Sequence, residues 1–144
     1  MDAEVWMVAD QTLQDLAAEH EAYHSAAAAL RDALAAPVPS YLSVALKFGQ
    51  LIELIRTHLH HEEQQMVNEF YAENHPAAFQ RHTQEHQYFF RRLNEIADSF
   101  VKATRAAGYQ APAQNLFTLV EHLDQHMATL DQQFADYCKH ESLA

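Results

Sequence analysis

The chain has 144 residues, of which 49% are apolar, so it is long enough for one domain and too apolar for a disordered polymer. Its formal net charge of −11 argues against nucleic acid or an anionic membrane as a partner, since both require a basic face. Only two glycines and four prolines are present, which leaves little material for tight turns, and strong helix formers dominate instead. The composition predicts an all-α protein.

Cys138 is the only cysteine, which rules out an internal disulfide and is typical of a reducing compartment. The first residues, MDAEVWMVADQ, lack the positive start and the long apolar run of a signal peptide. No stretch approaches the ~18 consecutive apolar residues of a membrane span. We therefore expect a soluble cytoplasmic protein with no membrane partner.

Three breaks rich in proline or glycine divide the chain into four long segments. They lie at residues 37–40, 74–76 and 108–112, where prolines stop or open helices and Ser40 or Asn74 can cap the next helix. The predicted helices cover residues 12–35, 41–73, 77–107 and 113–140. Because the connections are short, neighbouring helices should run antiparallel, which predicts a single domain over residues 1–144 folded as an up-down-up-down four-helix bundle.

The first helix is expected to begin at Thr12, because Thr12 and Asp15 form a pair similar to a capping box. Residues 1–11 are then an N-terminal arm. His20 lies on the apolar stripe of this helix, one turn after Leu16.

The second and third helices each carry a pair of metal-ligand residue types on the apolar stripe. His58 and Glu62 form an HxxxE pair in the second helix, and His82 and His86 form an HxxxH pair in the third. Residues four apart share one helical face about 6 Å apart along the axis, so both members of a pair can reach the same centre.

The fourth helix carries His126 and Asp131 as an HxxxxD pair. Five residues place two side chains roughly 140° apart on an ideal helix. Both therefore point inward only if the seam of the bundle lies between them or if a π-bulge realigns them. His122 has the better angle relative to His126 but lies a turn away, so we expect it at the edge of the site.

Each predicted helix thus places at least one polar residue on its apolar stripe, where burial costs several kcal/mol unless the residue is paired. The eleven histidines outnumber the nine lysines and arginines, and histidine is the commonest metal ligand. One shared metal site explains this pattern more economically than four unrelated exceptions.

The order of these groups resembles that of the hemerythrin family. The segments LAAEHEAYH, HLHHEEQQM, HTQEHQYFF and LDQHMATLD are similar to the four ligand segments of that family, and the resemblance covers nearly the whole chain. It implies a bundle core with two iron ions per chain, bridged by an oxo or hydroxo group. The implied ligands are His82, His86 and His126 on one iron, His20 and His58 on the other, and Glu62 and Asp131 bridging both.

This ligand count leaves one position open on the iron held by His20 and His58. The resemblance implies that dioxygen, or another small diatomic or peroxide ligand, binds there, as in a protein that stores, carries or senses dioxygen. One departure favours a diiron enzyme of the peroxidase or oxidase kind, or one acting on nitric oxide. His24 stands where the family usually has an aromatic or large apolar residue, and it is a candidate proton donor. A ferritin-like carboxylate site fits less well, since only Glu21 and His24 match its Glu-x-x-His pattern.

Overall fold

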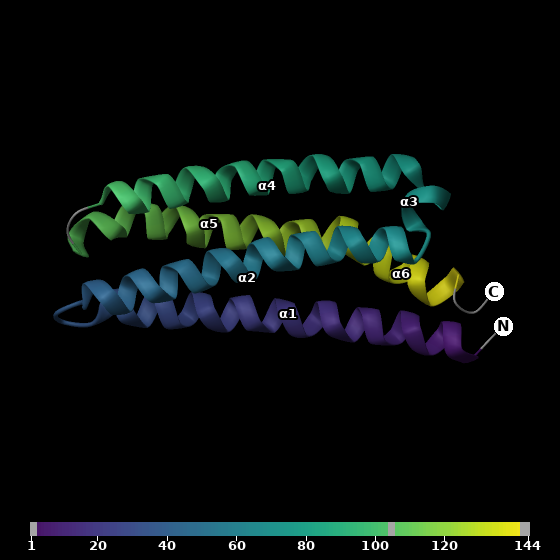
Figure 1. Ribbon diagram of the computed structural model, residues 1–144, viewed down its shortest axis with the longest axis horizontal. Coiled ribbons are helices and arrows are strands. Elements are labelled where there is room, and N and C mark those ends of the chain that lie inside the picture. The colour runs from purple at the N-terminus through teal and green to yellow at the C-terminus, as the bar shows by residue number, and fades with distance from the viewer. Residues whose placement is uncertain (1–2, 104–105, 142–144) are drawn as a thin grey trace.

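Four long rods of helix lie side by side and run alternately up and down, with both chain ends at the same end of the bundle (Figure 1). The structure is a computed structural model that describes the backbone of residues 3–103 and 106–141. Side chains are described for residues 11–103 and 108–139. The first three rods are α1 (Ala3–Ala35), α2 (Tyr41–Asn68) and α4 (Pro76–Lys102). The fourth is made of α5 (Gln110–His126), the π-helix η2 (Met127–Asp131) and α6 (Gln132–Glu141). The all-α bundle predicted from the sequence is confirmed.

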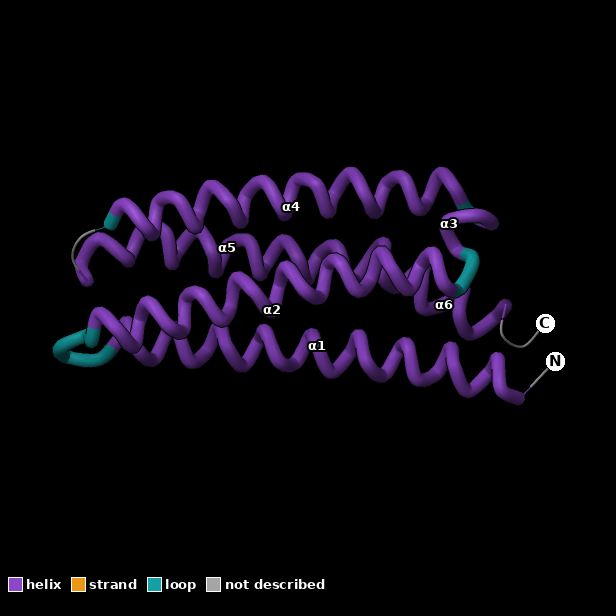
Figure 2. Tube along the Cα trace, viewed as in Figure 1, coloured by secondary structure: helices purple, strands orange, loops and turns teal. Residues whose placement is uncertain are grey.

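Short connections join the rods, and Figure 2 shows how little of the described chain is loop. Ser40 caps α2 as expected, because its hydroxyl accepts a hydrogen bond from the backbone N–H of Ser43 at 3.3 Å. Pro76 occupies the first turn of α4, where its missing N–H costs nothing. No described helix is long and apolar enough to cross a membrane.

The predicted start of the first helix is wrong. Helix α1 begins at Ala3, so residues 3–11, expected to form an arm, are helical, while residues 1–2 lie outside the described part. Thr12 is buried within the helix, and its hydroxyl lies 3.4 Å from side-chain oxygens of Gln65 and Glu69 on α2. A contact between rods has therefore replaced the local cap that the sequence suggested.

Two other predicted ends also move. Helix α2 stops at Asn68, because Phe70 takes a left-handed conformation with φ 63°, which costs about 1–2 kcal/mol for a residue with a Cβ. The chain then makes the single turn α3 (Tyr71–Asn74) before α4. Helix α4 ends at Lys102 rather than at residue 107, and the short 3₁₀-helix η1 (Ala106–Tyr109) leads into α5.

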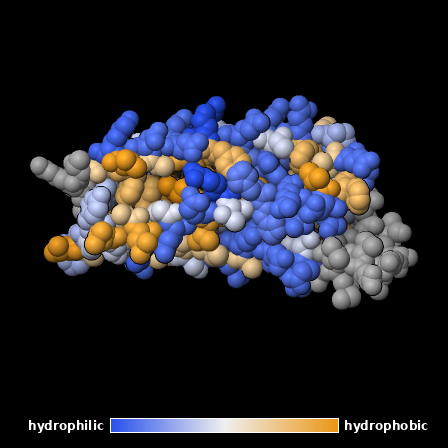
Figure 3. Space-filling view, viewed as in Figure 1, coloured by the Kyte–Doolittle hydropathy of each residue, from blue (hydrophilic) through white to orange (hydrophobic). Residues whose placement is uncertain are grey.

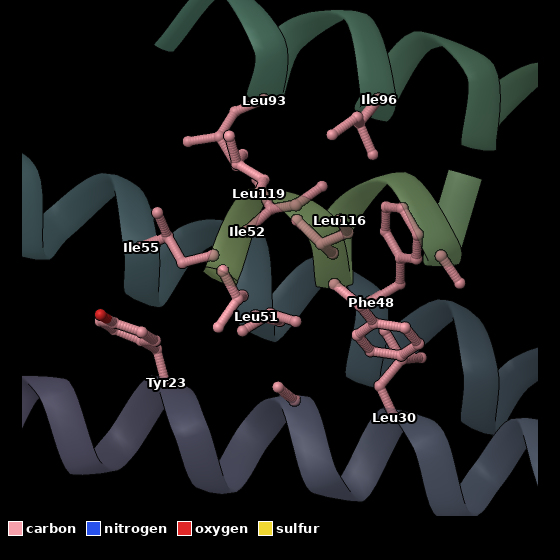
Figure 4. Close-up of a cluster of buried hydrophobic side chains, with 14 of the residues drawn as sticks. Tyr23, Leu30, Phe48, Leu51, Ile52, Ile55, Leu93, Ile96, Leu116 and Leu119 are labelled. Atoms are coloured by element: carbon pink, nitrogen blue, oxygen red, sulfur yellow. The ribbon is translucent and has the colours of Figure 1, made fainter. Parts of the chain in front are cut away.

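Two apolar clusters fill the bundle along its length. The larger one draws leucine, isoleucine and aromatic side chains from all four rods (Figure 4). The smaller one lies toward the end that holds the chain termini and is formed by Leu16, Met66, Tyr71, Phe134, Tyr137 and Cys138. Along every rod, the predicted polar site residues lie near the junction of the two clusters. The fold therefore places a polar layer inside an apolar core.

Apolar and hydrophilic side chains occupy different parts of the surface. Figure 3 shows apolar side chains gathered toward the end where α1 and α2 connect, and mostly hydrophilic atoms over the rest of that face. Val38, Leu42 and Leu46 are among the exposed apolar residues near this connection.

Candidate metal centre

The polar layer consists of residues that the sequence predicted as metal ligands. Five histidines and Glu62 are buried, and Asp131 is 15% exposed. The buried histidines are His20, His58, His82, His86 and His126. The structure brings all seven predicted ligand residues together from α1, α2, α4, α5 and η2.

Five of the seven residues form one set of possible donors. One atom each from Glu62, His82, His86, His126 and Asp131 lies within 4.8 Å of the others. Nε2 of His86 is 3.0 Å from Oε1 of Glu62, and Nε2 of His126 is 2.9 Å from Oδ1 of Asp131. Three imidazoles thus face two carboxylates around a common point.

His20 and His58 form a second set with the same Asp131, again within 4.8 Å. Glu62 also faces both sides. Its Oε1 lies toward His86, whereas its Oε2 is 3.6 Å from Nε2 of His58. Both carboxylates are therefore placed between the two groups of histidines.

The π-helix explains how both His126 and Asp131 reach this layer. Gln132 donates its backbone N–H to the carbonyl of Met127, five residues back, as a π-helix requires. The wider turn brings residues five apart onto one face. Of the two routes left open by the sequence, the structure contains the π-bulge.

Three carboxylates outside the seven accept hydrogen bonds from Nδ1 of site histidines on the next rod. The pairs are Glu19 with His58 at 3.0 Å, Glu63 with His86 at 2.9 Å, and Glu85 with His126 at 2.5 Å. Such a bond fixes the tautomer and leaves Nε2 free to serve the centre. These carboxylates were not predicted from the sequence, although each one directly precedes or follows a predicted ligand.

The charges in the layer are strongly coupled. Burial alone would raise the pKa of Glu62, but contacts with His126, His82 and His86 hold it well below its usual value. Burial lowers the pKa of His126 and His86, yet hydrogen bonds outweigh it: Asp131 and Glu62 raise the pKa of His126 to about 10, and Glu62 and Glu63 raise that of His86 to about 9. Together these contacts favour a proton on the His86–His126 pair, whose Nε2 atoms lie 3.1 Å apart, when no metal is bound.

On the side of the layer that holds His20 and His58, burial has the stronger effect on the pKa of a histidine. Burial, and then the proximity of His58, lowers the pKa of His20 to about 3, so its imidazole is neutral at physiological pH. A neutral imidazole is the form that binds a metal. Burial and the charge of Glu62 raise the pKa of Asp131, as expected for two carboxylates sharing a site.

His82 provides a test of whether the layer suits a cation. It is wholly buried, and neither ring nitrogen has a hydrogen-bond partner among the described residues. Its Nδ1 lies 3.5 Å from Oδ1 of Asp131 and 3.7 Å from Oε1 of Glu62. A buried polar atom without a partner normally costs about 1–3 kcal/mol, and a cation held among these three residues would remove that cost. The residues fit a metal.

A family model described as the hemerythrin HHE cation-binding domain matches residues 11–138. The chain belongs to the hemerythrin family. Comparison with curated proteins and with solved structures gives no match. The resemblance seen in the four histidine segments is therefore confirmed, and the chain is a helical cation-binding protein.

A cavity of about 480 Å³ opens onto the side of the polar layer that holds His20 and His58. It reaches His20, His58, Glu62 and Asp131, but none of the three histidines of the larger donor set lines it. Its remaining walls come from α1, η2 and α6. A small molecule entering here meets the side that has fewer donors.

The predicted position of His24 is wrong. We expected its side chain to point along the stripe of α1 toward the open side, but it is 46% exposed and its Nε2 lies 2.8 Å from Oδ1 of Asp124 on α5. It does not line the cavity. Tyr23 is the buried neighbour instead, with its hydroxyl 3.3 Å from Nε2 of His20 and 3.5 Å from Sδ of Met127.

The other described histidines of the hemerythrin domain lie outside the layer. His60, His75 and His122 are exposed, and His60 stacks on Phe90. His61 is half-buried and shares Glu19 with His58, its Nδ1 lying 2.7 Å from Oε2 of that carboxylate.

Proposed function

We propose that this hemerythrin-family chain is a non-haem diiron protein that binds dioxygen reversibly for storage, transport or sensing. Mixed imidazole and carboxylate donors suit iron, and two anionic carboxylates between the two sets of histidines offset part of the charge of two buried cations. In this proposal His82, His86 and His126 hold one iron, and His20 and His58 hold the other. Glu62 and Asp131 bridge them together with an oxo or hydroxo group.

The observation that carries the proposal is the asymmetry of the layer. The larger set has three imidazoles and the smaller set has two, and of these five imidazoles the cavity reaches only the two of the smaller set. His82, His86 and His126 would hold one iron together with the shared carboxylates, and His20 and His58, with fewer donors, would leave the other iron a position open to a ligand beside the cavity. Two bound irons would supply the electrons for dioxygen binding at that position.

The residues near the open side favour reversible binding over enzymatic turnover. Stable dioxygen binding requires that no proton donor lie beside the open position. Leu13, Leu16, Met127 and Phe134 line the cavity, its one lysine, Lys139, is exposed on α6, and burial raises the pKa of the Tyr23 hydroxyl, which makes it a poor acid. The peroxidase or oxidase alternative depended on His24, which lies outside the cavity.

A cytoplasmic location is part of the same proposal. The thiol of Cys138 is buried in the smaller apolar cluster, and burial raises its pKa to about 12, so it is inert toward oxidation. Such a thiol is compatible with a reducing compartment.

Oxygen uptake by the reduced, iron-loaded protein tests the function. We expect one dioxygen per two irons, released under argon, and blocked by azide. Leu13→Trp at the cavity should slow uptake, whereas Leu46→Trp on the outer surface of α2 should not. Irreversible oxidation without any release of dioxygen would contradict a carrier or sensor and support the enzyme alternative.

A further inference from the structure

The cavity beside His20 and His58 is much larger than a diatomic ligand requires. Its volume is about 480 Å³, whereas one water takes up about 30 Å³ in the liquid. Pockets for small organic molecules in proteins span roughly 300–1,000 Å³. The cavity therefore has room for an organic molecule in addition to whatever binds at the centre.

The walls of the cavity are mainly apolar. Leu13 and Leu16 contribute from α1, Met127 from η2, and Phe134 from α6. These side chains surround the route from the surface to the polar layer. They suit the hydrocarbon part of a ligand, because burying apolar surface stabilises the bound state.

The charged residues of the cavity are arranged unevenly. Glu62 and Asp131 belong to the layer at its inner end, and Lys139 is the one Lys or Arg among its described lining residues. Lys139 is exposed on α6. In a chain with a net charge of −11, this places a cation beside an apolar cavity and sets the expected sign of a ligand head group.

We propose that the cavity binds a small organic acid, with its hydrocarbon part against the apolar walls and its carboxylate near the ammonium of Lys139. The ligand lies beside the open metal position and covers the way into it. The proposal goes beyond dioxygen binding, because it concerns the walls of the cavity and holds whether or not dioxygen is the physiological ligand of the centre.

Calorimetric titration of the purified metal-loaded protein with straight-chain carboxylates from acetate to octanoate tests this proposal. Affinity should rise about fourfold for each added methylene group until the cavity is filled. Ala17→Phe should abolish octanoate binding, because Ala17 is exposed and lines the cavity. Ala18→Phe is the matched control, since Ala18 is exposed and is not among the lining residues.

The head group is tested with Lys139→Met. It should weaken octanoate binding about two- to fivefold, as expected for an exposed ion pair, and leave octanol binding unchanged. Lys102→Met, at the far end of α4, should change neither. Affinity that does not depend on chain length, or that survives Ala17→Phe, would overturn the proposal. Octanoate that displaces azide and ignores Lys139→Met would show that the carboxylate binds the metal, and this would overturn the assignment to Lys139.

Discussion

Removing the outer carboxylates should weaken metal binding although none of them is a proposed ligand. Glu63 and Glu85 hold His86 and His126 through Nδ1. Loss of such a contact typically costs 10–100-fold in metal affinity, or about 1.4–2.7 kcal/mol. Glu63 is 28% exposed and Glu85 47% exposed, so water screens the contact of Glu63 less. Glu63→Ala should therefore fall near the upper end of this range and Glu85→Ala near the lower end.

The substitution Glu63→Gln separates geometry from charge. The amide oxygen can still accept the hydrogen bond from Nδ1 of His86, but the negative charge is lost. We expect an effect between those of the wild type and Glu63→Ala. Affinity is measured by competition with a chelator, and iron release by stopped flow. Glu121→Ala is the control, because Glu121 is exposed on α5 and is not part of the layer.

Affinities of Glu63→Ala and Glu85→Ala within twofold of wild type would refute this reasoning. The two carboxylates would then be surface groups that happen to lie near the histidines. An equal loss in Glu121→Ala would point to a general effect of net charge instead.

Three more predictions follow from the layer. Metal affinity should rise between pH 7 and about pH 9–10 and then level off, because the metal displaces protons from His86 and His126, whose pKa values are raised to about 9 and 10; a flat profile in chelator competition would contradict this. His24→Phe should leave metal content and dioxygen release unchanged and cost less than about 1 kcal/mol in urea unfolding, since its pair with Asp124 is exposed; a longer-lived oxygenated state would restore its role as a proton donor. Glu62→Ala should lose metal and about 1–3 kcal/mol of stability, since Nε2 of His86, 3.0 Å from Oε1 of Glu62, loses that buried partner; unchanged metal content would remove Glu62 from the centre.

The sequence predicted the parts of this fold that depend on periodicity. Each ligand pair had a fixed spacing on an apolar stripe, and helical geometry then placed both members on one face. Even the awkward spacing of His126 and Asp131 was informative, because only a shifted seam or a π-bulge could reconcile it. Polar residues on apolar stripes were a reliable sign of a common site.

Features that depend on contacts between rods could not be predicted in this way. Thr12 had the local pattern of a cap, but its hydroxyl faces Gln65 and Glu69 on α2 instead. His24 has the right spacing from His20, yet Asp124 on α5 draws its ring outward. A sequence pattern specifies which face of a helix a residue occupies, but not which partner on a neighbouring helix its side chain reaches.

The outer carboxylates lie between these two cases. Glu19, Glu63 and Glu85 each stand next to a predicted ligand, so their neighbourhood was visible in the sequence. Their role depends on the rotation of the adjacent rod, which brings a histidine within hydrogen-bonding distance. An acidic residue adjacent to a ligand in a helical bundle is thus a useful marker for carboxylates that orient histidines.

The metal content of the purified chain tests the two-iron centre most directly. Seven buried or nearly buried donors, with Asp131 shared by both sets, predict two irons per chain by elemental analysis. The oxidised protein should also show near-ultraviolet absorption from the oxo bridge, altered by azide. One zinc per chain with no iron, in protein that is fully folded, would contradict the proposed centre.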